Sequence, residues 1–116
     1  MRRLGETLES LEAVVVSRKS AASARSYTSR LLSGGVAAIG AKVTEEAGEL
    51  VAAAAGESDD RVVSEAADLL YHTLVLLACR GLPLAAVESE LARRFGISGL
   101  DEKAARGSQN SVPDND

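Results

Sequence analysis

Residues 58–80 of the chain read SDDRVVSEAADLLYHTLVLLACR. The opening Ser-Asp-Asp is a favourable helix start, because the serine can cap the first turn and the two acids complement the helix dipole. The residues that follow are apolar on nearly all sides of a helix, which is typical of a buried helix. We therefore expect a buried helix that runs from this start to about Arg80 and is ended by Gly81.

The segment before this one predicts a long partner helix over Val36–Ala55, ended by Gly56 in the left-handed conformation. Only a short turn separates the two helices, so they are expected to pack antiparallel. A short helical piece over Tyr27–Leu32, capped by Ser26, precedes the partner helix, and Ser33-Gly34-Gly35 breaks the chain between them.

Two further helices are expected outside this pair, one over residues 4–18 and one from Pro83 to about Phe95, with a small, polar loop over residues 19–26. Apolar residues, mainly Ala, Leu and Val, make up 46% of the chain and aromatic residues only 3%, a composition that favours helices over strands. The predicted fold is all-α: a compact antiparallel bundle of about four main helices over residues 1–100, then a flexible polar tail over residues 101–116.

The net charge of −4 argues against a general nucleic-acid-binding protein. Residues 1–42 hold seven Lys and Arg against three Glu, whereas residues 43–116 hold six Lys and Arg against fourteen Asp and Glu. A site that binds both phosphates and cations would need a basic and an acidic segment, although ordinary helix-surface charge would give the same asymmetry.

Nothing in the sequence predicts export or membrane insertion. The N-terminus lacks the apolar region of a signal peptide, and the longest apolar stretch falls short of the roughly 18 residues that span a bilayer. A soluble, cytoplasmic protein is therefore expected, with its single cysteine, Cys79, as a buried structural thiol.

Acidic residues are concentrated on the two central helices. Glu45, Glu46 and Glu49 lie three or four residues apart, so their carboxylates can lean over one sector of the Val36–Ala55 helix. Glu65 and Asp68 share a face of the next helix in the same way. Packed antiparallel, the two helices would bring these carboxylates together, and a site made only of oxygen ligands suits Mg²⁺ or Mn²⁺.

The alternative is that these acids form solvated helix faces, which is the usual role of a Glu-Glu-x-x-Glu pattern. The second helix favours a metal, because Glu65 and Asp68 lie among apolar residues and buried carboxylates need partners. Arg61 is the only Lys or Arg within one turn of Glu65, and Asp68 has none.

Several motifs together resemble a known family; they are Ser26-Tyr27-Thr28 with Leu31, Lys42-Val43, Glu45-Glu46-Ala47, Glu49-Leu50, Glu65-Ala66-Ala67-Asp68-Leu69-Leu70-Tyr71-His72, Leu74-Val75-Leu76-Leu77 and Gly81-Leu82. The chain resembles phosphoribosyl-ATP pyrophosphohydrolase, of the all-α NTP pyrophosphatase superfamily. The acidic motifs mark the superfamily, and Ser-Tyr-Thr together with Tyr-His points to this member. Thr44 departs from the glycine that is usual before the acidic pair.

The resemblance implies an enzyme of the second step of histidine biosynthesis. It would hydrolyse phosphoribosyl-ATP to phosphoribosyl-AMP and pyrophosphate, by attack of a metal-activated water at the α–β phosphate linkage. It further implies a homodimer, a nucleotide substrate, and Mg²⁺ (Mn²⁺ as a substitute) held by Glu45, Glu46, Glu49, Glu65 and Asp68. One of the carboxylates is expected to accept the proton of the attacking water, and the catalytic candidates are Glu45, Glu46 and Glu49.

The basic residues Lys42, Arg18, Lys19, Arg25 and Arg30 are candidates for binding the phosphates of the substrate. Each has an alternative: Lys42 can pair with a carboxylate one turn away, and the others can be solvated surface residues. For Tyr71 and His72 we expect a place in the core or at an interface, with hydrogen bonds satisfied, in preference to a metal-binding role.

Two rival functions stay open at this point. A house-cleaning nucleoside triphosphate pyrophosphatase would share the fold and the metal site but act on another nucleotide. A non-enzymatic helical association module would have only solvated acids. A phosphate-binding-loop enzyme is disfavoured, because Ser33-Gly34-Gly35 lacks the Gly-Lys-Ser/Thr of that loop.

Overall fold

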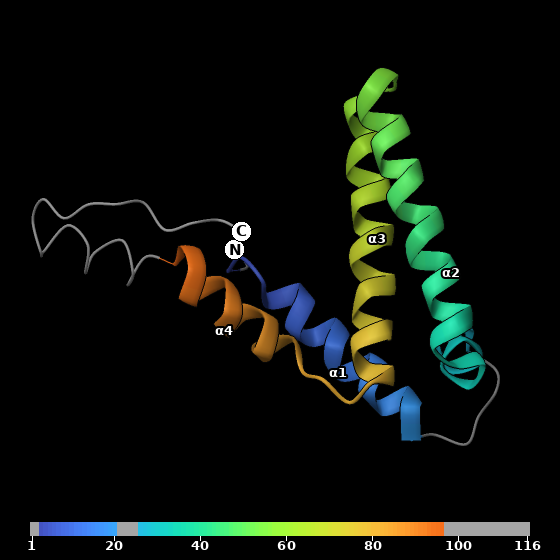
Figure 1. The fold of residues 1–116 in the computed structure, drawn as a ribbon, viewed down its shortest axis with the longest axis vertical. Helices are drawn as coiled ribbons and strands as arrows, with labels where there is room; N and C mark the ends of the chain where they lie inside the picture. The colour runs from blue at the N-terminus through green and yellow to red at the C-terminus, as the bar shows by residue number, and fades with distance from the viewer. Residues whose placement is uncertain (1–2, 21–25, 97–116) are drawn as a thin grey trace, which may run out of the picture. The chain divides into compact units, whose positions relative to one another are not determined.

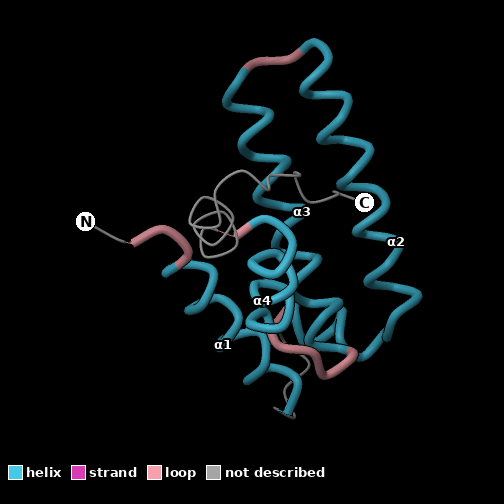
Figure 2. Tube along the Cα trace, turned by 60° about the vertical axis from the view of Figure 1, so that its left-hand side comes forward, coloured by secondary structure: helices cyan, strands magenta, loops and turns pink. Residues whose placement is uncertain are grey.

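The computed structural model describes residues 3–20 and 26–96, which contain helices and connecting loops and no strand (Figure 2). The helices are α1 (Glu6–Ser20), α2 (Tyr27–Gly56), α3 (Asp59–Cys79) and α4 (Leu84–Phe95) (Figure 1). The predicted all-α fold with four main helices is therefore confirmed. Residues 21–25 of the predicted loop and the predicted tail over residues 101–116 lie outside the described residues.

Helices α2 and α3 form an antiparallel hairpin and lie side by side along most of their length (Figure 1). The turn between them is short because Glu57 leaves α2 in an extended conformation and Ser58 immediately caps α3, its hydroxyl accepting from the Arg61 N–H at 3.3 Å. The prediction for Gly56 is wrong. This glycine is the last residue of α2, and the left-handed glycines of the described residues are Gly5, Gly35 and Gly81.

The predicted break before the partner helix is a kink within α2. At Gly35 the backbone has φ +73° and ψ −168°, a conformation that is accessible to glycine and strained for other residues. The segment before the kink begins at Ser26, whose hydroxyl accepts a hydrogen bond from the Ser29 N–H at 2.9 Å, as predicted for a helix cap.

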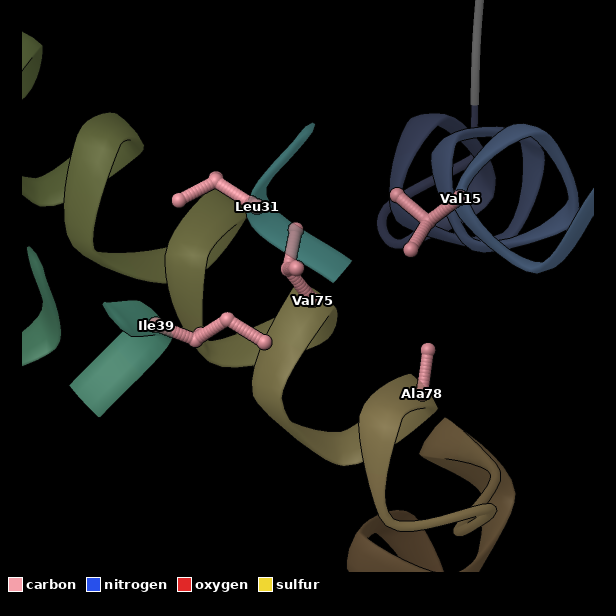
Figure 3. Close-up of a cluster of buried hydrophobic side chains, with 5 residues drawn as sticks. All are labelled: Val15, Leu31, Ile39, Val75 and Ala78. Atoms are coloured by element: carbon pink, nitrogen blue, oxygen red, sulfur yellow. The ribbon is translucent and has the colours of Figure 1, made fainter. Parts of the chain in front are cut away.

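The core lies where α1 and both arms of α2 meet α3. Its buried apolar side chains are Val15 from α1, Leu31 and Ile39 from the two arms of α2, and Val75 and Ala78 from α3 (Figure 3). Because the kink lies between Leu31 and Ile39, both arms of α2 contribute a side chain beside Val75. Burial of these side chains fixes which face of each helix points outward and which points to its neighbours.

The hairpin also leaves apolar side chains in solvent, so the prediction that α3 is buried on nearly all sides is wrong for the single chain. Val63 and Leu70 on α3 are 68% and 51% exposed, and Val51 on α2 is 70% exposed. By length and composition α3 is a candidate membrane span, the one candidate among the described residues. Core helices of soluble proteins pass the same test, and α3 carries carboxylates that would each cost about 3 kcal/mol at a bilayer centre.

Pro83 begins a second compact unit of the chain, which contains α4. Pro83 is the N-cap of α4, as its fixed φ allows, and the helix ends at Phe95, as predicted. Within α4, hydrogen bonds from Arg93 and Arg94 lower the pKa of Glu90 to about 2.

Candidate functional site

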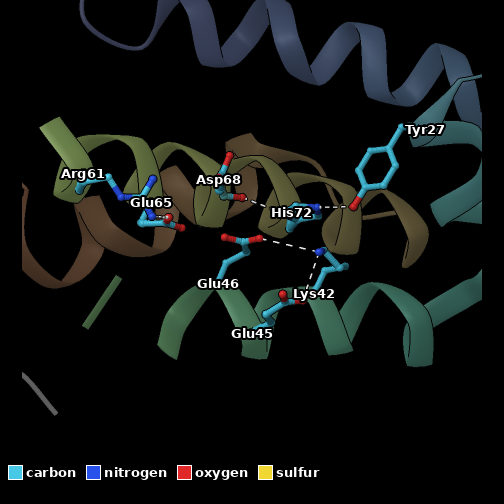
Figure 4. A network of polar contacts seen from close by, with 8 residues as sticks. All are labelled: Tyr27, Lys42, Glu45, Glu46, Arg61, Glu65, Asp68 and His72. Atoms are coloured by element: carbon cyan, nitrogen blue, oxygen red, sulfur yellow. Dashed lines mark hydrogen bonds and ion pairs between the residues drawn. The ribbon is translucent and has the colours of Figure 1, made fainter. Parts of the chain in front are cut away.

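Three carboxylates converge between α2 and α3. Glu46 and Glu49 come from α2 and Glu65 from α3, and one oxygen of each lies within 4.8 Å of the others. Glu46 and Glu65 are buried, with 6% and 3% exposure, whereas Glu49 is exposed. Figure 4 shows Glu46 pointing from α2 toward the helix that carries Glu65 and Asp68. We refer to Glu46, Glu49 and Glu65 as the acidic cluster.

The acidic cluster contains buried oxygens without a hydrogen-bond donor. Oε1 of Glu46 and Oε1 of Glu65 are both buried and unpartnered within the described structure. Such an oxygen costs free energy unless a cation or a donor satisfies it. A set of carboxylate oxygens is the ligand set that Mg²⁺ and Mn²⁺ prefer, so these residues fit a hard divalent cation.

The electrostatics of the cluster agree with this fit. Burial raises the pKa of Glu46 to about 7, and the nearby Glu65 carboxylate and the charges of Glu49 and Asp68 act in the same direction. The pKa of Glu49 is raised as well, by desolvation beside the cluster and by the charge of Glu65. A proton or a metal cation therefore stabilises the cluster, because either one offsets the repulsion between its carboxylates.

The other two predicted metal ligands lie at the edge of the cluster. The carboxylate of Glu45 is 52% exposed and accepts a hydrogen bond from Lys42 Nζ at 3.1 Å. Asp68 is exposed, and its charge acts on Glu46. Of the five predicted ligands, the structure thus brings three together and leaves Glu45 and Asp68 beside them.

Lys42 pairs with carboxylates one turn away, which was the alternative to binding a substrate phosphate. Besides Glu45, its ammonium lies 3.9 Å from Oε2 of Glu46. The hydrogen bond to Glu45 is the largest of the effects that raise the pKa of Lys42. The ammonium thus lies next to the acidic cluster, within one turn of helix.

The remaining basic candidates lie elsewhere. Lys19 donates from Nζ to the backbone oxygen of Ala78 at 2.8 Å, so it links the end of α1 to the end of α3. Its ammonium satisfies a carbonyl in the last turn of that helix, a position where cations are favoured. Arg18 and Arg30 are exposed, and Arg25 lies outside the described residues.

A polar and aromatic network connects the start of α2 with the middle of α3. The His72 ring is buried, with Nδ1 2.9 Å from the backbone oxygen of Asp68 and Nε2 2.9 Å from the hydroxyl of Tyr27 (Figure 4). Because a carbonyl can only accept, Nδ1 carries a proton and donates it to the Asp68 carbonyl, while Nε2 and the Tyr27 hydroxyl share a second hydrogen bond. The predicted core histidine is confirmed.

Next to it, Thr28 Oγ1 and the Tyr71 hydroxyl share a hydrogen bond, and the rings of Tyr27 and Tyr71 stack with centroids 6.2 Å apart. The Ser-Tyr-Thr and Tyr-His motifs are therefore neighbours in space. The sequence identified both motifs but did not pair them, since only the fold of the hairpin shows that residues more than forty positions apart make contact.

The acidic cluster thus lies between two antiparallel helices, and the Ser-Tyr-Thr and Tyr-His motifs contact each other further along α3. These motifs are the ones by which the sequence resembles the all-α pyrophosphohydrolases. Residues 8–95 match the sequence model of the family described as phosphoribosyl-ATP pyrophosphohydrolase. The chain belongs to this family.

Its relatives agree with the family match. A phosphoribosyl-ATP pyrophosphatase of Trichlorobacter lovleyi is 56% identical over 99 residues, which cover 85% of this chain and 92% of that protein. The proteins of the same name from Erythrobacter litoralis and Pelobacter propionicus are 50% and 46% identical, over 87% and 91% of this chain and 97% and 98% of their own lengths.

Proposed function

We propose that this chain hydrolyses phosphoribosyl-ATP to phosphoribosyl-AMP and pyrophosphate, the second step of histidine biosynthesis. The family match supports the substrate, because it extends over the whole hairpin and over nearly the full length of the relatives. The observation that carries the chemistry is the acidic cluster with its two unpartnered buried oxygens.

The metal in this proposal is Mg²⁺, with Mn²⁺ as a substitute. Glu46, Glu49 and Glu65 would hold it, with Glu45 and Asp68 as the predicted ligands at the edge. When bound, the cation offsets the charge that develops on the phosphates and on the leaving pyrophosphate. Its ligands come from both helices of the hairpin, so the packing of α2 on α3 sets the geometry of the site.

Side chains of this protein would accept the proton of the attacking water and bind the substrate phosphates. Water attacks a phosphorus of the α–β linkage in line with the leaving group, and Glu45, Glu46 or Glu49 accepts its proton. Lys42 is the best placed of the basic candidates to meet a substrate phosphate, since its ammonium already lies beside Glu45 and Glu46. A phosphate arriving there would replace the Glu45 carboxylate as the partner of Lys42.

The protein is further proposed to be a cytoplasmic homodimer. The exposed apolar side chains of the hairpin support this assembly, because two copies that covered them would remove Val51, Val63 and Leu70 from water. No nucleic-acid or membrane partner is proposed.

The test is pyrophosphate release from phosphoribosyl-ATP with and without Mg²⁺, with ATP and dUTP assayed in parallel. We expect metal-dependent release from phosphoribosyl-ATP and little from the simple triphosphates. Preference for ATP or dUTP would assign the same site to nucleotide house-cleaning. No release from any of them would favour the association module.

Variants make the test specific for the cluster. Glu65→Gln removes one charge of the cluster and should lower turnover by two orders of magnitude or more, about what the loss of a well-placed catalytic or charge-stabilising group costs. Glu88→Gln is the matched control, because Glu88 is an exposed glutamate of α4 and should leave turnover unchanged. Equal activity of the wild type and Glu65→Gln would contradict the proposed site.

A further inference from the structure

Arg61 connects the turn of the hairpin to the acidic cluster. Its Nε donates to Oε1 of Glu57 at 3.2 Å, and its Nη2 donates to Oε2 of Glu65. Glu57 directly follows α2, and Arg61 and Glu65 occupy the first two turns of α3, so the three residues form a ladder with i, i+4 spacing. Figure 4 shows its inner step, from Arg61 to Glu65. The outer part of the ladder is half exposed, whereas the carboxylate of Glu65 is 4% exposed.

This contact makes the two oxygens of Glu65 different. Oε2 has the guanidinium as its partner, whereas Oε1 is buried and without a partner. A glutamate side chain has several rotatable bonds, and holding one of its oxygens removes much of that freedom. The oxygen that stays available is therefore already in place when a cation arrives.

The charge of Arg61 acts in the same sense. Three carboxylates within 4.8 Å of one another repel each other when no cation is bound. The guanidinium of Arg61 offsets part of that repulsion through Oε2 of Glu65, and Oε1 of Glu65 stays available. Residues that orient metal ligands in this way change metal affinity about 10- to 100-fold when they are replaced.

We propose that Arg61 is a positioning residue for the metal site: its guanidinium holds Glu65 through Oε2 and leaves Oε1 as the oxygen that binds the divalent cation. This inference rests on the proposed metal site and extends it to a residue outside the acidic motifs. The alternative is that Arg61 weakens metal binding, because its positive charge repels a divalent cation. In that case the removal of Arg61 would strengthen metal binding.

The experiment is calorimetric titration of the full chain with Mn²⁺ alone, at pH 7.5 and without nucleotide. Arg61→Gln should weaken Mn²⁺ binding about 10-fold or more. Arg61→Lys should lie between it and the wild type, because lysine keeps the charge but not the planar fork that engages Glu57 and Glu65 together. Glu57→Gln should give a smaller loss, since it only loosens Arg61. Arg93→Gln, an arginine of an α4 ion pair, is the matched control and should bind Mn²⁺ as the wild type does.

Kinetics supply a second readout. The Mg²⁺ concentration for half-maximal pyrophosphate release should rise in Arg61→Gln in parallel with the Mn²⁺ dissociation constant. Turnover at saturating Mg²⁺ should change much less, because a positioned ligand set is restored once the metal is bound. A purely structural role would lower the unfolding midpoint of the metal-free variant and leave Mn²⁺ affinity unchanged.

The outcomes separate the two proposals. Unchanged or tighter Mn²⁺ binding by Arg61→Gln, beside normal binding by the wild type, overturns the role of Arg61 and leaves the metal site standing. Absence of Mn²⁺ binding by the wild type overturns both. If Arg61→Gln loses its helical circular dichroism, the Mn²⁺ affinities of Arg61→Lys and Glu57→Gln test the proposal instead. Wild-type Mn²⁺ affinity in both variants would refute it.

Discussion

At the scale of single residues, the cluster shows how burial determines what a glutamate can do. Glu46 and Glu65 have the same side chain and similar exposure, but their partners differ, since Glu65 has Arg61 on one oxygen and Glu46 has Lys42 at 3.9 Å. Desolvation outweighs the attraction of the Lys42 ammonium and disfavours the charged form of Glu46, so burial is the main reason that its pKa is raised to about 7. The residue is stable when it is protonated, or when a cation stands beside it.

This shift predicts an unusual pH dependence of stability for the metal-free protein. Glu46 has a pKa of about 7 in the folded chain and about 4.5 when unfolded, so between these values the folded state binds more protons. The free energy of unfolding in EDTA should therefore fall as the pH rises from about 4.5 to about 7. Urea unfolding at several pH values measures it.

Glu46→Gln should remove most of this fall, because an amide does not titrate, and should make the metal-free protein more stable at pH 8. The control, Glu88→Gln, should keep the slope. Glu90 does not interfere, because its lowered pKa confines its own contribution to the window between about 2 and 4.5. A metal-free stability that rises with pH over 4.5–7 would contradict the pKa of Glu46.

At the scale of elements, the helices could be predicted from local signals, and the details of their contacts could not. The cap at Ser58 and the start at Pro83 placed α3 and α4 correctly, because capping acts within one turn. Gly56 shows the limit of such signals: Ser58 already begins the next helix, so α2 ends without a left-handed residue.

The site depends on more than local signals. Spacing put Glu45 and Glu46 on neighbouring positions of one face, but it could not decide which would enter the cluster. That depends on the rotation of α2 against α3, which leaves the Glu45 carboxylate exposed beside Lys42. The pairing of Tyr27 with His72 likewise depends on the angle of the kink at Gly35, a property of the folded hairpin.

The kink itself gives a prediction at this scale. Gly35→Ala should lower the free energy of unfolding by about 1 to 3 kcal/mol, the usual cost of a non-glycine residue at a strained positive φ. Gly40→Ala is the matched control. It lies in the helical part of α2 with open space around its Cβ position, so it should raise stability by roughly 0.5 to 1 kcal/mol. Thermal or urea unfolding of both variants decides, and equal effects would show that the kink carries no strain.

At the scale of the whole molecule, the hairpin of α2 and α3 leaves several large apolar side chains exposed to solvent. The buried core lies at the end where α1 and both arms of α2 reach α3. Val63 and Leu70 are seven residues apart, so they lie on one face of α3, and both are more than half exposed. A chain of this length gains little stability from its own core, and covering this face with a second copy would add to it.

The dimer prediction follows from that face. Val63→Glu with Leu70→Glu should convert a homodimer to a monomer, because two charges at an apolar contact would be desolvated on association. Light scattering after size-exclusion chromatography measures the mass of each form over a range of concentrations. Val16→Glu, at a half-exposed valine of α1, is the control and should leave the mass unchanged. Since the substituted residues are exposed in the single chain, helical circular dichroism should persist in all variants. A wild type that stays monomeric at every concentration would show that this face has no second copy as its partner.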